Sequence, residues 1–164
     1  KGPDLPVDSV NWEEAMHFCS ALTDIHRRAG SIPEGWIWSL PTEAEWEYAC
    51  RAGSTNDYSG KIELMGWYDL NSGERPHSVR GKEPNSWGLF DMHGNVWEWC
   101  ADWYDPQYYS RAVDMDPRGP QSGTTRVIRG GAWDFVPRLV RCANRSSVVP
   151  ENRCCYLGFR VVLR

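Results

Sequence analysis

Six cysteines and four histidines are the residues of this chain best suited to metal or redox chemistry. They are Cys19, Cys50, Cys100, Cys142, Cys154 and Cys155, with His17, His26, His77 and His93. No C-x-x-C pair occurs and no histidine has finger-like spacing, so a structural zinc site is not predicted. The histidines form neither H-x-H nor H-E-x-x-H, the patterns of iron and zinc catalytic centres. Local spacing therefore indicates no metal or redox site.

Length and composition set the broad class of the protein. A chain of 164 residues is expected to form a single domain, 1–164, with a sizeable core. The net charge of −4 gives no electrostatic reason to bind nucleic acid. No apolar run is long enough for a membrane-spanning segment and no export signal is visible, so the cellular location stays open.

The elements that must position these side chains are few. The spacing of apolar residues after Asn11 predicts an amphipathic helix over about 12–29, and Thr42 with Glu45 predicts a capped second helix ending before Gly53. From 54 to 125 the periodicity gives way to Gly, Pro, Asn and Asp turns between short aromatic pieces. Strands are expected at 126–129 and 159–163. We therefore expect an α+β fold with two helices, a small twisted antiparallel sheet and much irregular backbone.

Four strings of residues carry a family resemblance. They are LPTEAEWEY (40–48), WGLFDMHGNVWEW (87–99), RGGAW (129–133) and LGFR (157–160). In this order they resemble the formylglycine-generating, sulfatase-modifying family, which implies a C-type-lectin-like fold. The resemblance also implies that the N-terminal strands of similar domains are missing from this chain. Trp97, Trp99 and Trp133 are expected in the core.

The resemblance also suggests a calcium site around the Gly-Asn-Val-Trp-Glu turn. The matching positions are the carboxylates of Asp91 and Glu98 and the carbonyls of Gly94 and Val96. Two carboxylates and two carbonyls are a partial shell for this hard ion. The alternative is a hydrogen-bonded turn with Glu98 paired to an arginine. We expect no required cofactor, with structural calcium as the one candidate.

The family's oxidase holds copper with two thiols in the loop after the Gly-Gly motif, since thiolates suit copper(I). The corresponding positions here are Phe135 and Val140, which cannot bind copper. The resemblance further pairs Cys142 with Cys50, as a disulfide or contact, against buried free thiols as the alternative. We therefore expect a protein that is not an enzyme, with a divergent copper- or iron-dependent oxidase as the alternative.

The tail from Trp133 to Tyr156 alternates polar islands with irregular fillers, and we define 133–156 as the candidate variable region. Every filler can be encoded by a codon that differs from an asparagine codon only at its adenines. This pattern is similar to the variable proteins of diversity-generating retroelements, in which reverse transcription rewrites template adenines. The fillers are Asp134, Phe135, Val136, Leu139, Val140, Ser146, Ser147, Val148, Val149, Cys154, Cys155 and Tyr156.

The resemblance implies a ligand-binding display protein whose fillers form one exposed surface for an unknown protein or other macromolecule. Cell-surface or extracellular display would suit such a role. The arginines of the islands are expected to fix the loop backbone through fork-like hydrogen bonds. Ordinary core packing is the alternative for the apolar fillers, above all for Val140. These arginines are Arg138, Arg141, Arg145, Arg153 and Arg160.

Overall fold

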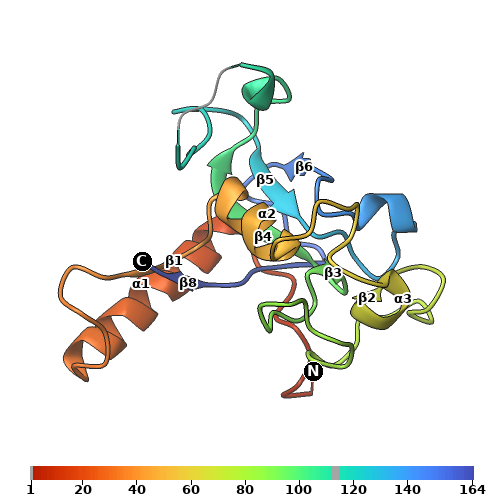
Figure 1. Cartoon of the computed structure of the whole chain (residues 1–164). Coiled ribbons are helices and arrows are strands. Elements are labelled where there is room, and N and C mark those ends of the chain that lie inside the picture. Colours follow the sequence, from red (N-terminus) through yellow and green to blue (C-terminus); the bar gives the residue numbers. More distant parts are fainter. Residues whose placement is uncertain (1, 112–114) are drawn as a thin grey trace.

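The computed structural model describes residues 2–111 and 115–164. Its helices are α1 (Trp12–Arg28), α2 (Glu43–Arg51) and α3 (Ile62–Met65), with 3-10 turns η1 (Tyr108–Ser110) and η2 (Pro137–Leu139). Its strands are β1 (Trp38–Ser39), β2 (Gly66–Trp67), β3 (His93–Gly94), β4 (Trp97–Trp103), β5 (Arg126–Arg129), β6 (Ser146–Val148), β7 (Leu157–Gly158) and β8 (Val162–Leu163). Long irregular segments join them (Figure 1).

Both main helices begin as their capping residues predict. The Asn11 side chain accepts the Glu14 N–H and the Glu14 carboxylate accepts the Asn11 N–H, which closes a capping box on α1. Thr42 and Glu45 make the same reciprocal pair on α2. These local bonds fix where each helix enters the core.

A four-stranded sheet in the order β6-β5-β4-β7 divides the core into two layers. On one face Trp99 and Ile128 pack with Ala15 and Cys19 of α1. The opposite face carries a second cluster that includes Trp46 and Cys50 of α2 and Cys100 of β4. In Figure 1 α2 crosses β4. The sheet thus holds a helix against each face, and β4 lies in its interior.

The α+β architecture with two main helices, small sheets and high loop content is as predicted. Two pairings differ from the expected antiparallel arrangement, because β7 lies parallel to β4 and β3 lies parallel to β2. The strand expected over 159–163 is also divided: β7 ends before Phe159, and β8 pairs instead with β1. No helix in the described part of the chain is long and apolar enough to cross a membrane.

A close backbone approach at Gly94 holds β3 against β2. Trp67 pairs with Gly94 across this short parallel ladder, and a Cβ atom at Gly94 would lie 1.8 Å from the Trp67 carbonyl oxygen. Gly94 also has φ +84°, a left-handed conformation that favours glycine. The position therefore requires glycine for both space and conformation.

We expect Gly94→Ala to lower the free energy of unfolding by about 3 kcal/mol or more, because the ladder must separate to admit the methyl group. Gly73→Ala is the matched control, since Gly73 has φ +60° but open space around its Cβ position. It should cost only about 1–2 kcal/mol, the penalty of a left-handed residue. Urea unfolding of both variants measures the difference, and equal losses would contradict the close-approach argument.

Candidate functional site

The candidate variable region forms an aromatic patch beside the core. The patch comprises Asp134, Phe135, Cys154 and Tyr156. The Phe135 ring contacts Trp97 edge-on at a centroid distance of 5.4 Å and lies 5.9 Å from the Tyr156 ring. A hydrogen bond with Cys154 is the main cause of the raised pKa of Tyr156, to which the nearby Asp134 charge adds. Segments 134–136 and 154–156 therefore lie side by side, with Phe135 and Tyr156 half-buried and Asp134 and Cys155 exposed.

The backbone of this patch is held by main-chain hydrogen bonds from the scaffold. The Asp69 N–H donates to the Phe135 carbonyl at 3.1 Å. The Ser9 N–H donates to the Cys154 carbonyl at 3.0 Å, and the Trp97 N–H donates to the Tyr156 carbonyl at 2.7 Å. Because these bonds use only backbone atoms of the patch residues, they do not depend on which side chains the patch carries.

The remaining fillers divide between the surface and the core. Val136, Val149 and Cys155 are exposed, while Leu139 and the residues of β6, Ser146, Ser147 and Val148, are partly buried. Val148 packs against the same core cluster as Phe135. Val140 is fully buried and packs with Ile62 and Tyr68, so its assignment to the binding surface is wrong. Its side chain lies under Gly131, where an added Cβ would approach it within 2.5 Å.

Four of the five island arginines pair with carboxylates of the scaffold. Arg145 donates to both oxygens of Glu43, at 2.6 and 2.8 Å, and Arg153 pairs with Glu14. Arg141 donates to the Arg138 carbonyl and to Asp57. Arg160, the fourth, pairs with Glu98. The predicted role in fixing the loops is therefore present, mostly through side-chain ion pairs.

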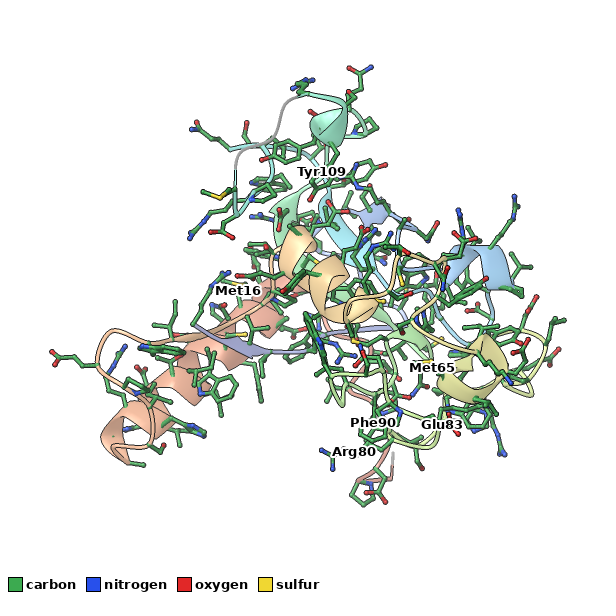
Figure 2. The ribbon with its side chains drawn as sticks, in the orientation of Figure 1. Met16, Met65, Arg80, Glu83, Phe90 and Tyr109 are labelled. Atoms are coloured by element: carbon green, nitrogen blue, oxygen red, sulfur yellow. The ribbon has the colours of Figure 1, made fainter. Side chains whose placement is uncertain are left out.

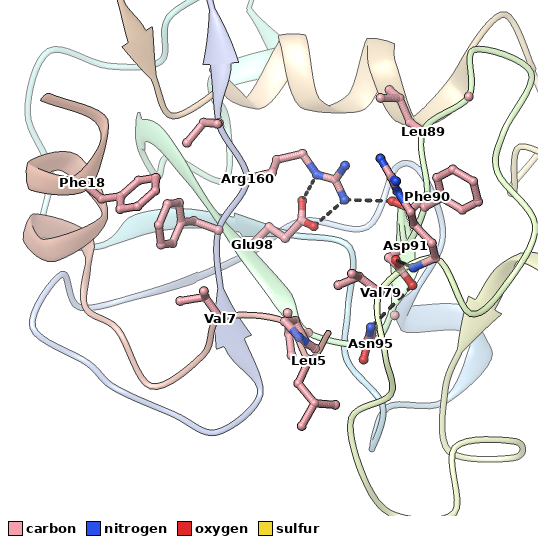
Figure 3. A pocket seen from close by; sticks show the side chains of 17 residues that line it. Leu5, Val7, Phe18, Val79, Leu89, Phe90, Asp91, Asn95, Glu98 and Arg160 are labelled. Atoms are coloured by element: carbon pink, nitrogen blue, oxygen red, sulfur yellow. Dashed lines mark hydrogen bonds and ion pairs between the residues drawn. The ribbon is translucent and has the colours of Figure 1, made fainter. Parts of the chain in front are cut away.

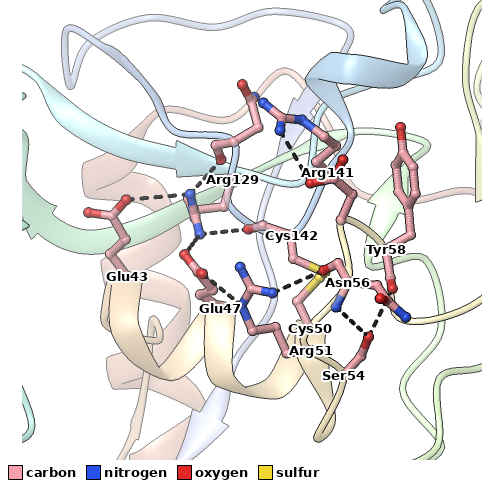
Figure 4. A network of polar contacts seen from close by, with 12 residues as sticks. Glu43, Glu47, Cys50, Arg51, Ser54, Asn56, Tyr58, Arg129, Arg141 and Cys142 are labelled. Carbon is pink, nitrogen blue, oxygen red and sulfur yellow. Dashed lines mark hydrogen bonds and ion pairs between the residues drawn. The ribbon is translucent and has the colours of Figure 1, made fainter.

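Arg129, which lies outside the islands, is a further arginine of this network of ion pairs. It is fully buried, donates to the Cys142 carbonyl at 2.8 Å, and pairs with Glu43 and Glu47 (Figure 4). Arg51 binds the other oxygen of Glu47 at 2.8 Å. Arg129 of β5, held by two glutamates of α2, thus fixes the backbone at Cys142, in the middle of the candidate variable region.

Glu98 lies beneath a pocket of about 500 Å³ and is fully engaged. Arg160 donates to both carboxylate oxygens at 2.6 Å, and the Trp46 indole N–H donates to one of them at 2.6 Å. Figure 3 shows the Arg160 guanidinium between Glu98 and the Phe90 carbonyl, which it also binds. The pairing of Glu98 with an arginine is the arrangement that the sequence analysis gave as the alternative to a calcium site.

Of the other predicted calcium ligands, Asp91 also has a hydrogen-bond partner within the protein. The Asp91 carboxylate accepts the Arg80 N–H at 2.8 Å, and burial raises its pKa, which disfavours the charged form that calcium needs. The Arg80 guanidinium lies over the Phe90 ring, 5.6 Å from its centroid (Figure 2). Glu98 is thus paired to Arg160, and calcium binding by Asp91, Gly94, Val96 and Glu98 stays a prediction.

Three buried side chains from separate elements form a cluster that local spacing had not indicated. Cys50 of α2, His93 of β3 and Cys142 after η2 place their ligand atoms within 4.8 Å of one another. All six cysteines are free thiols, so Cys50 and Cys142 are in contact without a disulfide. A side-chain hydrogen bond from Cys50 is the main cause of a lowered pKa of the Cys142 thiol. From the sequence, only the pairing of Cys50 with Cys142, which the family resemblance implies, indicated part of this cluster.

The positions expected for catalytic copper do not fit that metal. Phe135 lies in the aromatic patch and Val140 is buried among apolar side chains. Neither side chain offers a ligand atom.

Comparison with known proteins places this geometry in a family. The model of the sulfatase-modifying factor enzyme 1-like domain matches residues 1–164. The chain belongs to this family. It is 38% identical to the formylglycine-generating enzyme of Streptomyces coelicolor, over 96% of this chain and 52% of that protein. The chain spans about half the length, or less, of the formylglycine-generating enzymes it matches.

Solved structures extend the comparison. Treponema denticola variable protein 1 superposes with a TM-score of 0.86 and 31% identity, covering 96% of this chain and 70% of that one. The structure of PvdO from Pseudomonas aeruginosa gives a TM-score of 0.85 at 28% identity, covering all of this chain and 63% of that one. The family resemblance and the likeness to a variable protein are both confirmed.

The comparisons correct one expectation. Four curated relatives that are 31 to 38% identical are named formylglycine-generating enzyme. The expectation that the chain is not an enzyme, which was drawn from the missing thiols, is therefore wrong. It rested on two loop positions, whereas the similarity to these enzymes extends over nearly the whole chain.

We expect Glu98→Gln to lower the free energy of unfolding by about 3–5 kcal/mol, because it leaves the Arg160 charge buried without its partner. Asp24→Asn is the control, since the pair of Asp24 with Arg27 is exposed and should be worth less than about 1 kcal/mol. Chemical unfolding checks both values. Millimolar calcium should leave the melting temperature of the wild-type chain unchanged. A calcium-dependent rise that disappears in Glu98→Gln would contradict the ion-paired assignment.

Proposed function

We propose that this domain binds a polypeptide ligand at the aromatic patch, and that the side chains of the patch are diversified by a retroelement. The observation that carries the proposal is the backbone bonding at Phe135, Cys154 and Tyr156. Main-chain bonds hold these positions in place, so their side chains can change while the loops keep their course. The structural likeness to Treponema denticola variable protein 1 supports it.

The chemistry of the patch favours a protein or peptide as ligand. Phe135 and Tyr156 present aromatic area, and the exposed Val136 and Cys155 extend it. Aromatic residues are enriched at the centres of protein interfaces and charged residues are depleted there. Asp134 is the one ionisable carboxylate of the patch and would contact a basic or hydrogen-bonding group of the ligand.

Selection of a random-peptide display library against the immobilised chain tests the binding proposal. We expect enriched peptides to bind the wild-type chain and to lose at least tenfold in affinity for the double variant Phe135→Ser/Tyr156→Ser, because the anchoring aromatic area is removed. Tyr48→Ser is the matched control, since Tyr48 is 70% exposed and lies on α2 away from the patch. Equal loss in both variants, or no enrichment, would contradict the proposal.

The gene provides an independent check of the diversification part. We expect a near-copy of the segment encoding 133–156 close to the gene, with asparagine codons at filler positions, and a reverse transcriptase gene beside it. Sequencing of the locus decides this, and absence of both would contradict diversification while leaving the peptide binding to be judged by the selection.

A second candidate is oxidation of a cysteine thiol in a bound peptide, and the names of the four relatives support it. Oxygen consumption with a cysteine-containing peptide and added copper or iron tests it. Under this candidate we expect turnover that scales with the peptide and disappears when its cysteine is replaced by serine. Cys154→Ala and Cys155→Ala, made singly, show whether a thiol of the patch takes part. No oxygen consumption above the metal-only blank would exclude the candidate.

A further inference from the structure

We propose that Cys50, His93 and Cys142 form a buried binding site for one copper(I) ion, separate from the aromatic patch. The three residues come from α2, β3 and the loop after η2, so a bound ion would join three segments that are distant in sequence. All three side chains are buried. The proposal goes beyond peptide binding and does not depend on it.

The imidazole of His93 is oriented for metal binding. Its Nδ1 lies 2.8 Å from the Val140 carbonyl, and because a carbonyl only accepts, Nδ1 carries the proton. Nε2 is then the lone-pair nitrogen. It accepts the Ser59 hydroxyl at 2.8 Å and the Ser59 N–H at 3.2 Å, and it lies 4.0 Å from the Cys50 sulfur. A metal-binding histidine typically donates its second ring N–H to a carbonyl or carboxylate in this way.

The spacing of the ligand atoms suits a single ion. Protein ligands bind such metals at about 2.3 Å through sulfur and about 2.0 Å through nitrogen, so one ion bridges a sulfur and a nitrogen up to about 4.3 Å apart. The distance of 4.0 Å between the Cys50 sulfur and His93 Nε2 falls within this span. Binding requires that Nε2 release both the Ser59 N–H and the Ser59 hydroxyl, which lies 2.8 Å away, in exchange for the metal bond.

The ligand set favours copper(I) over zinc. Thiolate sulfur is a soft ligand that selects copper(I) and zinc. Structural zinc is almost always four-coordinate, and in the described ranges 2–111 and 115–164 no fourth cysteine, histidine, aspartate or glutamate joins the cluster. A buried site with two sulfurs and one nitrogen is therefore better matched to copper(I).

The charge of the filled site is balanced by the surrounding arginines. Two thiols would lose their protons to solvent while His93 stays neutral, so two thiolates and one copper(I) leave a single negative charge. The buried Arg129 binds the Cys142 carbonyl, and Arg51 lies on the next position after Cys50. The Cys142 N–H is also held, by the Asp57 carbonyl at 2.8 Å. These fixed partners keep the thiol in place for the ion.

His93 separates this proposal from a simple Cys50–Cys142 disulfide. A disulfide needs the two sulfurs and no imidazole, whereas a copper site loses a ligand when His93 is replaced. The neighbouring thiols of the exposed Cys155 and the half-buried Cys154 would compete for copper, so the test uses the background Cys154→Ser/Cys155→Ser.

The experiment is anaerobic titration of the reduced chain with copper(I) against a chromogenic copper(I) chelator. We expect one equivalent to bind and its X-ray absorption spectrum to show two sulfur neighbours and one nitrogen. His93→Gln should weaken binding at least tenfold, and Cys142→Ser should abolish it. Cys100→Ala is the control, because Cys100 is fully buried in the same core cluster but lies outside the site.

Three outcomes would overturn the proposal: no tight equivalent, unchanged affinity in His93→Gln, or an absorption spectrum without two sulfurs. A Cys50–Cys142 disulfide that resists reduction, found by mass spectrometry in both the wild-type chain and His93→Gln, would also overturn it. If Cys142→Ser fails to fold, the spectrum of the wild-type site and the His93→Gln titration still decide.

Discussion

The bidentate pair between Arg160 and Glu98 is the interaction on which the arrangement of the structure depends. Glu98 lies on β4, Arg160 follows β7, and Trp46 of α2 donates to the same carboxylate, each at 2.6 Å. A buried carboxylate must keep its partners, since removal of one leaves an uncompensated charge. These bonds fix β4, α2 and the chain that follows the candidate variable region relative to one another.

In the tail, the residues that fix the course of the backbone differ from those whose side chains form the patch. Its course is set by backbone bonds and by the arginine pairs to Glu14, Glu43 and Glu98. Under the proposed function, its fillers supply contact area. The separation is incomplete, because Phe135 and Tyr156 also rest against the core that contains Trp97. A replacement there changes packing as well as the surface, so the patch can vary most freely at exposed Asp134 and Cys155.

The sequence was informative wherever the determinants were local. Both capping boxes, the strand at 126–129 and the meeting of the two tail segments followed from residues close together or from the motifs. Burial of Val140 was expected only as the alternative to its place on the surface, because a codon pattern records what can change and not what is covered. The parallel pairing of β7 with β4 depends on a long connection that no periodicity encodes. The cluster of Cys50, His93 and Cys142 depends on three distant segments, so spacing rules for zinc could not detect it.

Val140 connects the two sites through its backbone. Its side chain fills the core below Gly131, while its carbonyl accepts the His93 N–H at 2.8 Å. A change of side chain at this position would leave that carbonyl chemically the same, yet a larger residue would push against Gly131 and move the turn that carries it. Because Cys142 follows two residues later, such a shift would reach both the imidazole and the thiol. Packing thus restricts this filler even though valine can be encoded by a codon that differs from an asparagine codon only at its adenines.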